Sequence, residues 1–365
     1  MTTAVEFRDV SKSYGSKPVV TNLNLTIEDN SFSVIYGAPA CGKSTILRLL
    51  TGLEKPDSGQ VFLRGRDVSG MAPGERNIGY VPQSFALYPH YKVFDNIGYP
   101  LKLMGMPKAQ IKPIVERTAE LLKITHLLTK KPEQLSGGEK QRVAIARGIV
   151  KDTNIFVLDD PLTGLDFKLR EQLFDDLRQM RTDLNATFVY TTSDPLETLI
   201  LAEDVHILDN CQIIETGPLD EVYSSPAHVR TMALLGFPEA NVFSGQLSRD
   251  GAEARISARI FDFDAKLDSV VDVPEAIKVA LRPQDLLVNP PADAGLLTAS
   301  GVIHLVEDLG GEQVVYLEVS ETHLVAVVRH DWGDLVEGPA TIGVNPDRLF
   351  LYAEETGRRI GRGKQ

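Results

Sequence analysis

One segment near the N-terminus constrains the fold of this chain more than any other feature. The segment GAPACGKS, Gly37 to Ser44, matches the pattern G-x-x-x-x-G-K-[ST] at every defined position. Phosphates bind where backbone N–H groups converge at the start of a helix, and glycines let the backbone approach closely. The strand-like SFSVIYG precedes the segment, and STILRLLTGL follows it with apolar residues at helical spacing. The pattern predicts a strand, a phosphate-binding loop and a helix.

The side chains of this loop have distinct predicted tasks. Lys43 is expected to neutralise the β- and γ-phosphates of a nucleotide, and Ser44 to coordinate Mg²⁺. Cys41 is interpreted as a small residue that fits the loop, and a redox role is the alternative. The residues expected to hold the nucleotide here are Gly37, Ala38, Pro39, Ala40, Cys41, Gly42, Lys43, Ser44 and Thr45.

A second segment supplies a metal-binding carboxylate. NIFVLDD is an apolar strand that ends in Asp159 and Asp160. Asp159 fits the acidic residue that holds Mg²⁺ through water in phosphate-loop enzymes. The sequence therefore predicts that ATP is bound together with Mg²⁺.

A third segment, LSGGE, is typical of a second anion site. Ser136 and Glu139 have the spacing of a capping box, and KQRVAIARGIV continues as a helix. Gly137 and Gly138 would expose backbone N–H groups at the start of that helix. An ordinary capped helix would explain the serine and glutamate alone, but not the whole string between the two nucleotide motifs.

The order of predicted elements indicates an α/β domain followed by a β-rich one. Helices are expected at about 108–125, 139–150 and 168–182, between the apolar strands NIFVLDD and ATFVYTT. This alternation predicts a parallel sheet covered on both faces. After about residue 238, short strands such as AIKVALR and QVVYLEV are separated by Gly, Asp and Pro, which predicts an all-β domain and a small barrel.

Composition excludes several classes of protein. A net charge of −12 argues against nucleic-acid binding, and two cysteines cannot form a disulfide framework. No stretch approaches the roughly 18 apolar residues of a membrane helix, and the N-terminus has no signal-peptide pattern. We therefore expect the chain to begin and remain in the cytosol.

The position of LSGGE resembles the signature of ABC transporters, and other landmarks follow in the family's order. Tyr14 resembles the aromatic platform for adenine, with a core tyrosine as the alternative. Gln83 resembles the glutamine that contacts Mg²⁺ and senses the membrane subunit, with a plain surface glutamine as the alternative. The segment TGLD, which ends at Asp166, resembles the D-loop. In this family, two domains sandwich each ATP between one chain's phosphate loop and the other's signature.

The resemblance covers essentially the whole chain and implies its architecture. Residues 1–237 would form the ABC ATP-binding domain, a RecA-like core with a helical subdomain at about 84–150. Residues 238–365 are similar to the oligonucleotide-fold regulatory domain of ATPase subunits that serve sugar, polyol and glycerol-phosphate importers, and ALRPQDL and VEDLGGEQVVYLEV carry that similarity. Polyamine, iron and molybdate importers carry related domains.

Two catalytic positions depart from the family's pattern. The residue after Asp159 is usually a glutamate that polarises the attacking water, and here it is Asp160. In VYTTSDPLETLILAEDV, Ser193 occupies the position of the usual histidine that contacts the γ-phosphate. With the phosphate loop and LSGGE intact, the two changes together suggest a degenerate, weakly hydrolysing site.

The economical explanation is one half of an ATPase heterodimer, in which this chain's signature completes the competent site of an unlike partner. The expected partners are two permease subunits, that second ATPase and, indirectly, a periplasmic or extracellular solute-binding protein. The chain would lie at the cytoplasmic face of the inner membrane. A slow homodimer of another importer class and a non-transport regulatory ATPase remain the alternatives.

Overall fold

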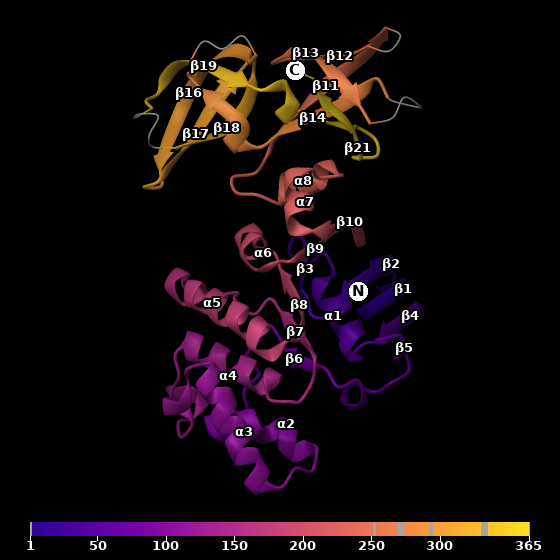
Figure 1. Cartoon of the computed structure of the whole chain (residues 1–365), viewed down its shortest axis with the longest axis vertical. Helices are drawn as coiled ribbons and strands as arrows, with labels where there is room; N and C mark the ends of the chain where they lie inside the picture. Colours follow the sequence, from indigo (N-terminus) through magenta and orange to yellow (C-terminus); the bar gives the residue numbers. More distant parts are fainter. Residues whose placement is uncertain (1, 251–252, 269–273, 292–294, 330–334, 365) are drawn as a thin grey trace. The chain divides into compact units, whose positions relative to one another are not determined.

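The computed structural model describes residues 2–250, 253–268, 274–291, 295–329 and 335–364. The chain divides into two compact units, Met1–Leu219 and Asp220–Gln365, which are coloured from indigo to magenta and from pink to yellow in Figure 1. The domain boundary expected after residue 237 stays a prediction. Among the described residues, no helix is long and apolar enough to cross a membrane.

The N-terminal unit is built around a six-stranded sheet. In spatial order its strands are β10 (Gln212–Pro218), β9 (Asp204–Asp209), β3 (Phe32–Tyr36), β8 (Thr187–Thr192), β7 (Ile155–Asp159) and β6 (Gly79–Val81). All neighbours pair in parallel except β10, which runs antiparallel to β9. Every residue of β3, β7 and β8 is buried, as expected for a parallel sheet covered on both faces. The predicted parallel sheet is confirmed.

A second, antiparallel sheet completes the core of this unit. Its strands are β2 (Lys17–Glu28), β1 (Thr3–Tyr14), β4 (Ser58–Leu63) and β5 (Arg66–Asp67). Helix α1 (Lys43–Thr51) contributes Ile46, Leu47 and Leu50 to a hydrophobic cluster that also contains side chains of β1, β3 and β7. Because α1 is held by apolar contacts from both sheets, the loop that precedes it is anchored on a rigid element.

The helices of the N-terminal unit include every helix that the sequence predicts. Besides α1, they are α2 (Val93–Leu103), α3 (Lys108–Leu121), α4 (Gly137–Ile149), α5 (Phe167–Leu184) and α6 (Pro195–Leu201). Helices α2, α3 and α4 pack on one another within the range expected for a helical subdomain. Helix α2 is not predicted, because Gly98 and Pro100 lower its helix propensity. A Cβ on Gly98 would lie only 3.0 Å from the Ile111 side chain, so glycine permits the close packing of α2 on α3.

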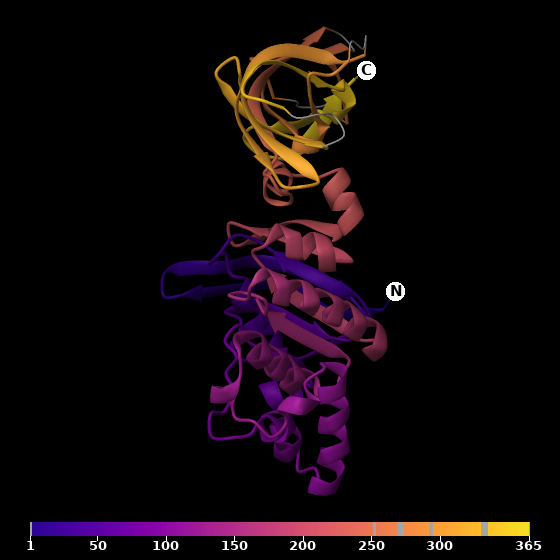
Figure 2. The same ribbon diagram turned by 90° about the vertical axis from the view of Figure 1, so that its left-hand side faces the viewer.

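The C-terminal unit begins with two short helices, α7 (Leu219–Ser224) and α8 (Val229–Leu234), and continues in strands. Six strands form a closed barrel, namely β11 (Asn241–Asp250), β12 (Glu253–Ala258), β13 (Asp262–Leu267), β21 (Arg359–Gly363), β20 (Phe350–Ala353) and β14 (Ala276–Leu281). Five strands form a sheet, namely β15 (Leu286–Val288), β19 (Gly338–Val344), β16 (Leu297–Asp308), β17 (Glu312–Val319) and β18 (Thr322–Arg329). The curvature of these strands is seen in Figure 2.

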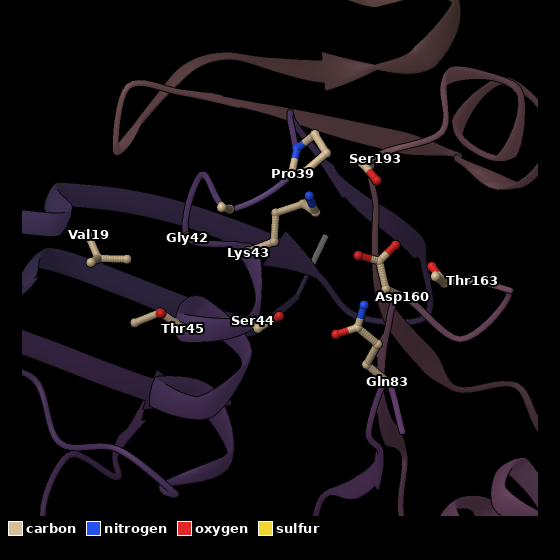
Figure 3. A pocket seen from close by; sticks show the side chains of 11 residues that line it. Val19, Pro39, Gly42, Lys43, Ser44, Thr45, Gln83, Asp160, Thr163 and Ser193 are labelled. Atoms are coloured by element: carbon tan, nitrogen blue, oxygen red, sulfur yellow. The ribbon is translucent and has the colours of Figure 1, made fainter. Parts of the chain in front are cut away.

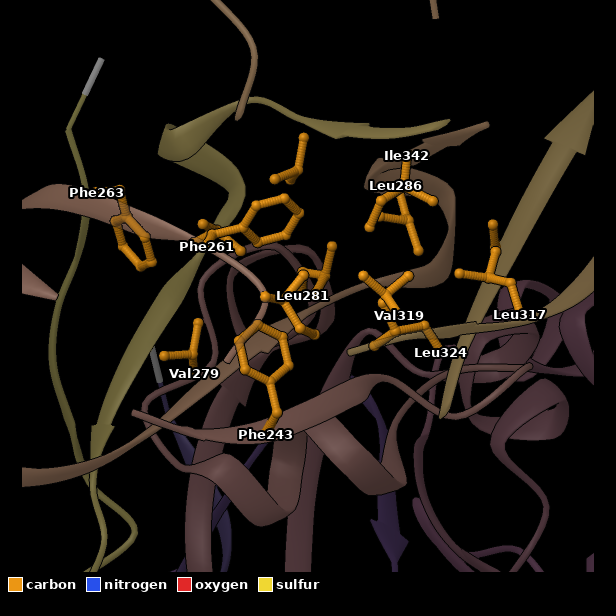
Figure 4. Close-up of a cluster of buried hydrophobic side chains, with 14 of the residues drawn as sticks. Phe243, Phe261, Phe263, Val279, Leu281, Leu286, Leu317, Val319, Leu324 and Ile342 are labelled. Atoms are coloured by element: carbon orange, nitrogen blue, oxygen red, sulfur yellow. The ribbon is translucent and has the colours of Figure 1, made fainter. Parts of the chain in front are cut away.

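The barrel and the five-stranded sheet share one hydrophobic core. Phe243 and Val279 from the barrel and Val319 and Ile342 from the sheet belong to the same buried cluster (Figure 4). The all-β domain and the small barrel that the sequence predicts are both present. The chain is therefore a mixed α/β protein with a β-rich C-terminal unit.

Candidate nucleotide site

The phosphate loop connects the end of β3 to the start of α1, as predicted. Gly42 is the N-cap of α1 and has a φ of 113°, and a Cβ there would lie 2.6 Å from the Val19 carbonyl oxygen. A Cβ on Gly37 would lie 2.4 Å from the Leu208 carbonyl oxygen. Because real Cβ atoms do not come this close to backbone, glycine is required at both positions.

Lys43 folds back over its own loop. Its Nζ donates to the carbonyl oxygens of Gly37, at 2.8 Å, and Ala38, at 3.1 Å, and the residue is only 5% exposed. The ammonium therefore lies within the loop, where it can neutralise phosphate charge.

The carboxylate of Asp159 lies next to Ser44. Its Oδ1 accepts from Ser44 Oγ at 2.8 Å and from Thr191 Oγ1 at 3.1 Å, and its Oδ2 accepts from the Tyr80 hydroxyl at 3.4 Å. A carboxylate and a hydroxyl at this distance fit the oxygen ligands, direct or through water, that Mg²⁺ prefers. Burial and the charge of Asp159 raise the pKa of Tyr80 to about 12, so its hydroxyl remains a donor at neutral pH.

A pocket of about 480 Å³ brings half of the predicted site residues together (Figure 3). Its lining residues are Val19, Pro39, Ala40, Gly42, Lys43, Ser44, Thr45, Gln83, Asp160, Thr163 and Ser193. Gln83, Asp160 and Ser193 come from three separate segments, and all face the phosphate loop. The volume and the mixed lining suit a small, charged ligand such as a nucleotide.

Asp160 has an unusual backbone conformation, and its surroundings shift the pKa of its carboxyl in opposite directions. Its φ is 45°, and its N–H donates to the Thr191 carbonyl oxygen at 3.1 Å. Burial raises the pKa of its carboxyl above the ordinary value, Lys43 opposes this, and Asp159 adds to it. Hydrogen bonds from the Ser193 N–H and the Thr163 hydroxyl also favour the charged form. Burial is the largest of these effects, and the carboxyl lies in the lining of the pocket that contains Lys43.

Ser136 begins α4 with the predicted capping box. Its Oγ accepts from the Glu139 N–H at 3.3 Å, and Glu139 Oε2 accepts from the Ser136 N–H at 2.7 Å. A Cβ on Gly137 would meet nothing within 4 Å, and none of the LSGGE residues lines the pocket. The signature is therefore not part of the lining of this pocket, and the space beside Gly137 is open.

Asp166 lies at the start of α5, close to the signature. Its Oδ1 accepts from the Leu169 N–H at 3.0 Å, which makes it the N-cap of α5. A Cβ on Gly138 would lie 2.7 Å from the Leu169 side chain. The signature residue Gly138 thus packs against the first turn of α5, which Asp166 caps.

Tyr14 and Cys41 lie at the margin of the site. Tyr14 ends β1, is 44% exposed and does not line the pocket. It is therefore not a core residue. The Cys41 thiol is half-buried, and burial raises its pKa, which lowers its reactivity and favours the packing role.

The sequence did not indicate three residues that contact the site. Val19 lines the pocket from β2, and Thr191 and Tyr80 donate to Asp159. Thr191 lies directly opposite Asp159 in the parallel pairing of β7 and β8. Both segments were predicted as strands, but the register of their pairing, which places Thr191 beside Asp159, could not be predicted from the sequence.

The fold and the pocket place the chain in the class of ATP-binding cassettes. The model of the ABC transporter family matches residues 20–163, and the model of the TOBE domain matches residues 279–351. The maltose/maltodextrin import ATP-binding protein MalK of Photorhabdus laumondii is 34% identical over 357 residues, which cover 96% of each chain. The MalK proteins of Yersinia pestis and Salmonella typhi are 36% and 35% identical with the same coverage. The chain belongs to this family of ABC import ATP-binding proteins and is an ABC ATPase that binds ATP.

Solved structures resemble the chain over the cassette length. A dimeric post-hydrolysis state of the ATP-binding cassette MJ0796, bound to ADP and Pi, has a TM-score of 0.55 and 28% identity, and covers 59% of this chain and 98% of that one. A nucleotide-free ATP-binding cassette from an ABC transporter has a TM-score of 0.54 at 22% identity, and it supports the fold alone.

Proposed function

We propose that this chain is the ATP-binding subunit of an importer for a small carbohydrate, a polyol such as glycerol, or a glycerol-phosphate. Relatives of known name that match over 96% of the chain are maltose/maltodextrin import proteins, which supports a sugar importer. The TOBE match agrees with a C-terminal regulatory domain. The subunit acts peripherally at the cytoplasmic face of the inner membrane.

ATP is bound with Mg²⁺ in the pocket between the phosphate loop and Asp160. Ser44 and Gln83 hold the metal with Asp159, and Lys43 neutralises the phosphates. The support is the 2.8 Å contact of Ser44 with Asp159 and the position of Gln83 in the same pocket. The metal supplies charge neutralisation at the β- and γ-phosphates. Tyr14 stacks on the adenine, and Ser136, Gly137, Gly138 and Asp166 face ATP held by a partner.

The observation that carries the degenerate-site proposal is the place of Asp160 and Ser193. Both line the pocket that contains Lys43, so their chemistry acts on the nucleotide held there. Aspartate is one methylene shorter than glutamate, and a misplacement of about 1 Å can cost about 100-fold in rate. Loss of a general base costs roughly 10²–10⁴. The site therefore holds ATP and hydrolyses it slowly.

The intact signature on this chain favours a heterodimer. Ser136 and Gly137 lie at the start of α4 and do not line the chain's own pocket, and they would complete a competent site on an unlike ATPase. The cassette MJ0796, which is similar in fold and sequence, forms a dimer. If this chain holds ATP and the partner hydrolyses it, this chain needs its signature but not the usual catalytic glutamate and histidine, which Asp160 and Ser193 replace.

The segment after Gln83, residues 84–96, docks a permease helix. Tyr88 and Tyr91 are 41% and 40% exposed, and both rings contact Tyr99, at centroid distances of 4.7 and 5.7 Å. Asn96 is fully buried and hydrogen-bonds the backbone of Tyr88 and Tyr91. Exposed tyrosines on an ordered loop are typical of binding surfaces, because they bury much area at a low entropic cost.

Native mass spectrometry of the complex tests this assembly. We expect one copy of this chain, one unlike ATPase with a glutamate and a histidine at the two catalytic positions, and two permease subunits. The double variant Tyr88→Ala/Tyr91→Ala should lose the permeases, whereas Tyr316→Ala, a tyrosine of the C-terminal unit, should retain them. Two copies of this chain with no other ATPase would refute the heterodimer and leave the slow homodimer.

A further inference from the structure

Tyr80 contacts the metal-site carboxylate from outside the pocket. It lies on β6, next to β7, and its hydroxyl is 3.4 Å from Asp159 Oδ2. It is absent from the pocket lining, so it does not face the nucleotide. Its ring packs against the hydrophobic core of the N-terminal unit. The hydroxyl is thus the one part of the side chain with a partner in the site.

The direction of this hydrogen bond follows from the partners of the phenol. A carboxylate oxygen only accepts, and a phenol has a single proton. The proton of the Tyr80 hydroxyl is therefore directed to Oδ2 of Asp159.

The two carboxylate oxygens of Asp159 therefore have different hydrogen-bond partners. Oδ1 accepts from the hydroxyls of Ser44 and Thr191, and Oδ2 accepts from Tyr80. The residue is 3% exposed, so water cannot replace a lost partner at low cost. Rotation of the carboxylate would break bonds on both sides. Residues that orient a metal ligand in this way affect metal affinity without touching the metal.

We propose that Tyr80 is a positioning residue of the Mg²⁺ site, whose hydroxyl holds Oδ2 of Asp159 and so keeps Oδ1 on the side of Ser44. The inference rests on the Mg²⁺ site proposed above. Tyr80 also precedes Gln83 by three residues on the same segment. The hydrogen bond of Tyr80 therefore links the strand that leads to Gln83 to Asp159, so Tyr80 helps to position both proposed metal-site residues.

The test compares ATP affinity with and without metal. The dissociation constant of the full chain for ATP is measured in EDTA and in Mn²⁺. The ratio of the EDTA value to the Mn²⁺ value reports how much the metal strengthens ATP binding. Tyr80→Phe removes only the hydroxyl. We expect the ratio to fall threefold to tenfold, as for the loss of about one hydrogen bond, with the affinity in EDTA unchanged. In an Asp159→Ala background, Tyr80→Phe should have no further effect.

Tyr190→Phe is the matched control. The Tyr190 hydroxyl is buried in the same sheet but donates to Glu197 at 2.7 Å, outside the pocket. Tyr190→Phe should lower the melting temperature and leave the ratio of the two dissociation constants unchanged. The inference would be overturned if Tyr80→Phe left the ratio unchanged or weakened ATP binding equally in EDTA and Mn²⁺. It would also be overturned if Tyr190→Phe lowered the ratio as much as Tyr80→Phe does. A wild-type ratio of one would instead refute the Mg²⁺ site itself.

Discussion

Replacing Gly137 with aspartate should abolish solute uptake, whereas replacing Lys43 with alanine should leave a measurable fraction of it. Gly137 is the first residue of α4, and the space around its Cβ position is open, so the variant folds without an internal clash. Its carboxylate would face the γ-phosphate of ATP held by the partner. At an effective dielectric near 20, two like charges about 4 Å apart repel by roughly 4 kcal/mol, enough to prevent closure.

In the proposed heterodimer, Lys43 would serve the other, degenerate site. It lines the pocket together with Asp160 and Ser193, where occupancy matters more than turnover. Its loss weakens ATP binding there, but the partner's phosphate loop continues to hydrolyse ATP. Uptake is measured with both variants at equal expression, and Gly74→Asp, at another open glycine of the same unit, is the control for added charge. If Lys43→Ala is as lethal as Gly137→Asp, the two sites are functionally equal and the proposal is wrong.

The double variant Asp160→Glu/Ser193→His should hydrolyse ATP about 100-fold faster than the isolated wild-type chain, which we expect to bind Mg·ATP but to turn it over poorly. Both positions line the pocket, and its volume of about 480 Å³ leaves room for the longer side chains. The added methylene moves the carboxylate away from the wall formed by Thr163 and the Ser193 backbone. Each single change should give a smaller gain, because base and phosphate contact act together.

Phosphate release by the purified chain measures this gain. Adding Lys43→Ala to the double variant should remove it, which excludes a contaminating ATPase. Turnover by the wild-type chain that matches a complete transporter would contradict the degenerate site.

The sequence predicted those parts of the site that depend on local chemistry. The phosphate loop, the strand that ends at Asp159 and the capping box of Ser136 each follow from residues a few positions apart, and the structure contains all three elements. The roles assigned to their side chains stay predictions. Tyr80 and Thr191 could not be found in this way, because each reaches Asp159 across a strand pairing whose register the sequence does not state.

The same limit applied to the fold. Helix α2 contains Gly98 and Pro100, and its helical state depends on packing against α3 and α4 rather than on propensity. In the C-terminal unit, individual strands were predictable, but closure of the barrel requires β14 to pair with both β11 and β20, which are far apart in the chain. Such non-local pairings are set by the whole core, not by any one segment.

The buried amide of Asn96 has a consequence for how quickly the transporter can assemble. It bonds to Tyr88 and Tyr91 and so closes their loop upon α2 before any permease arrives. A surface that is already ordered does not have to fold during an encounter, so each productive collision can lead directly to capture. Since α2 packs on α4, which begins at the signature, a permease docked at this loop, as proposed, would be joined to the signature through packed helices. A movement at the loop would then reach the signature as a displacement of these helices.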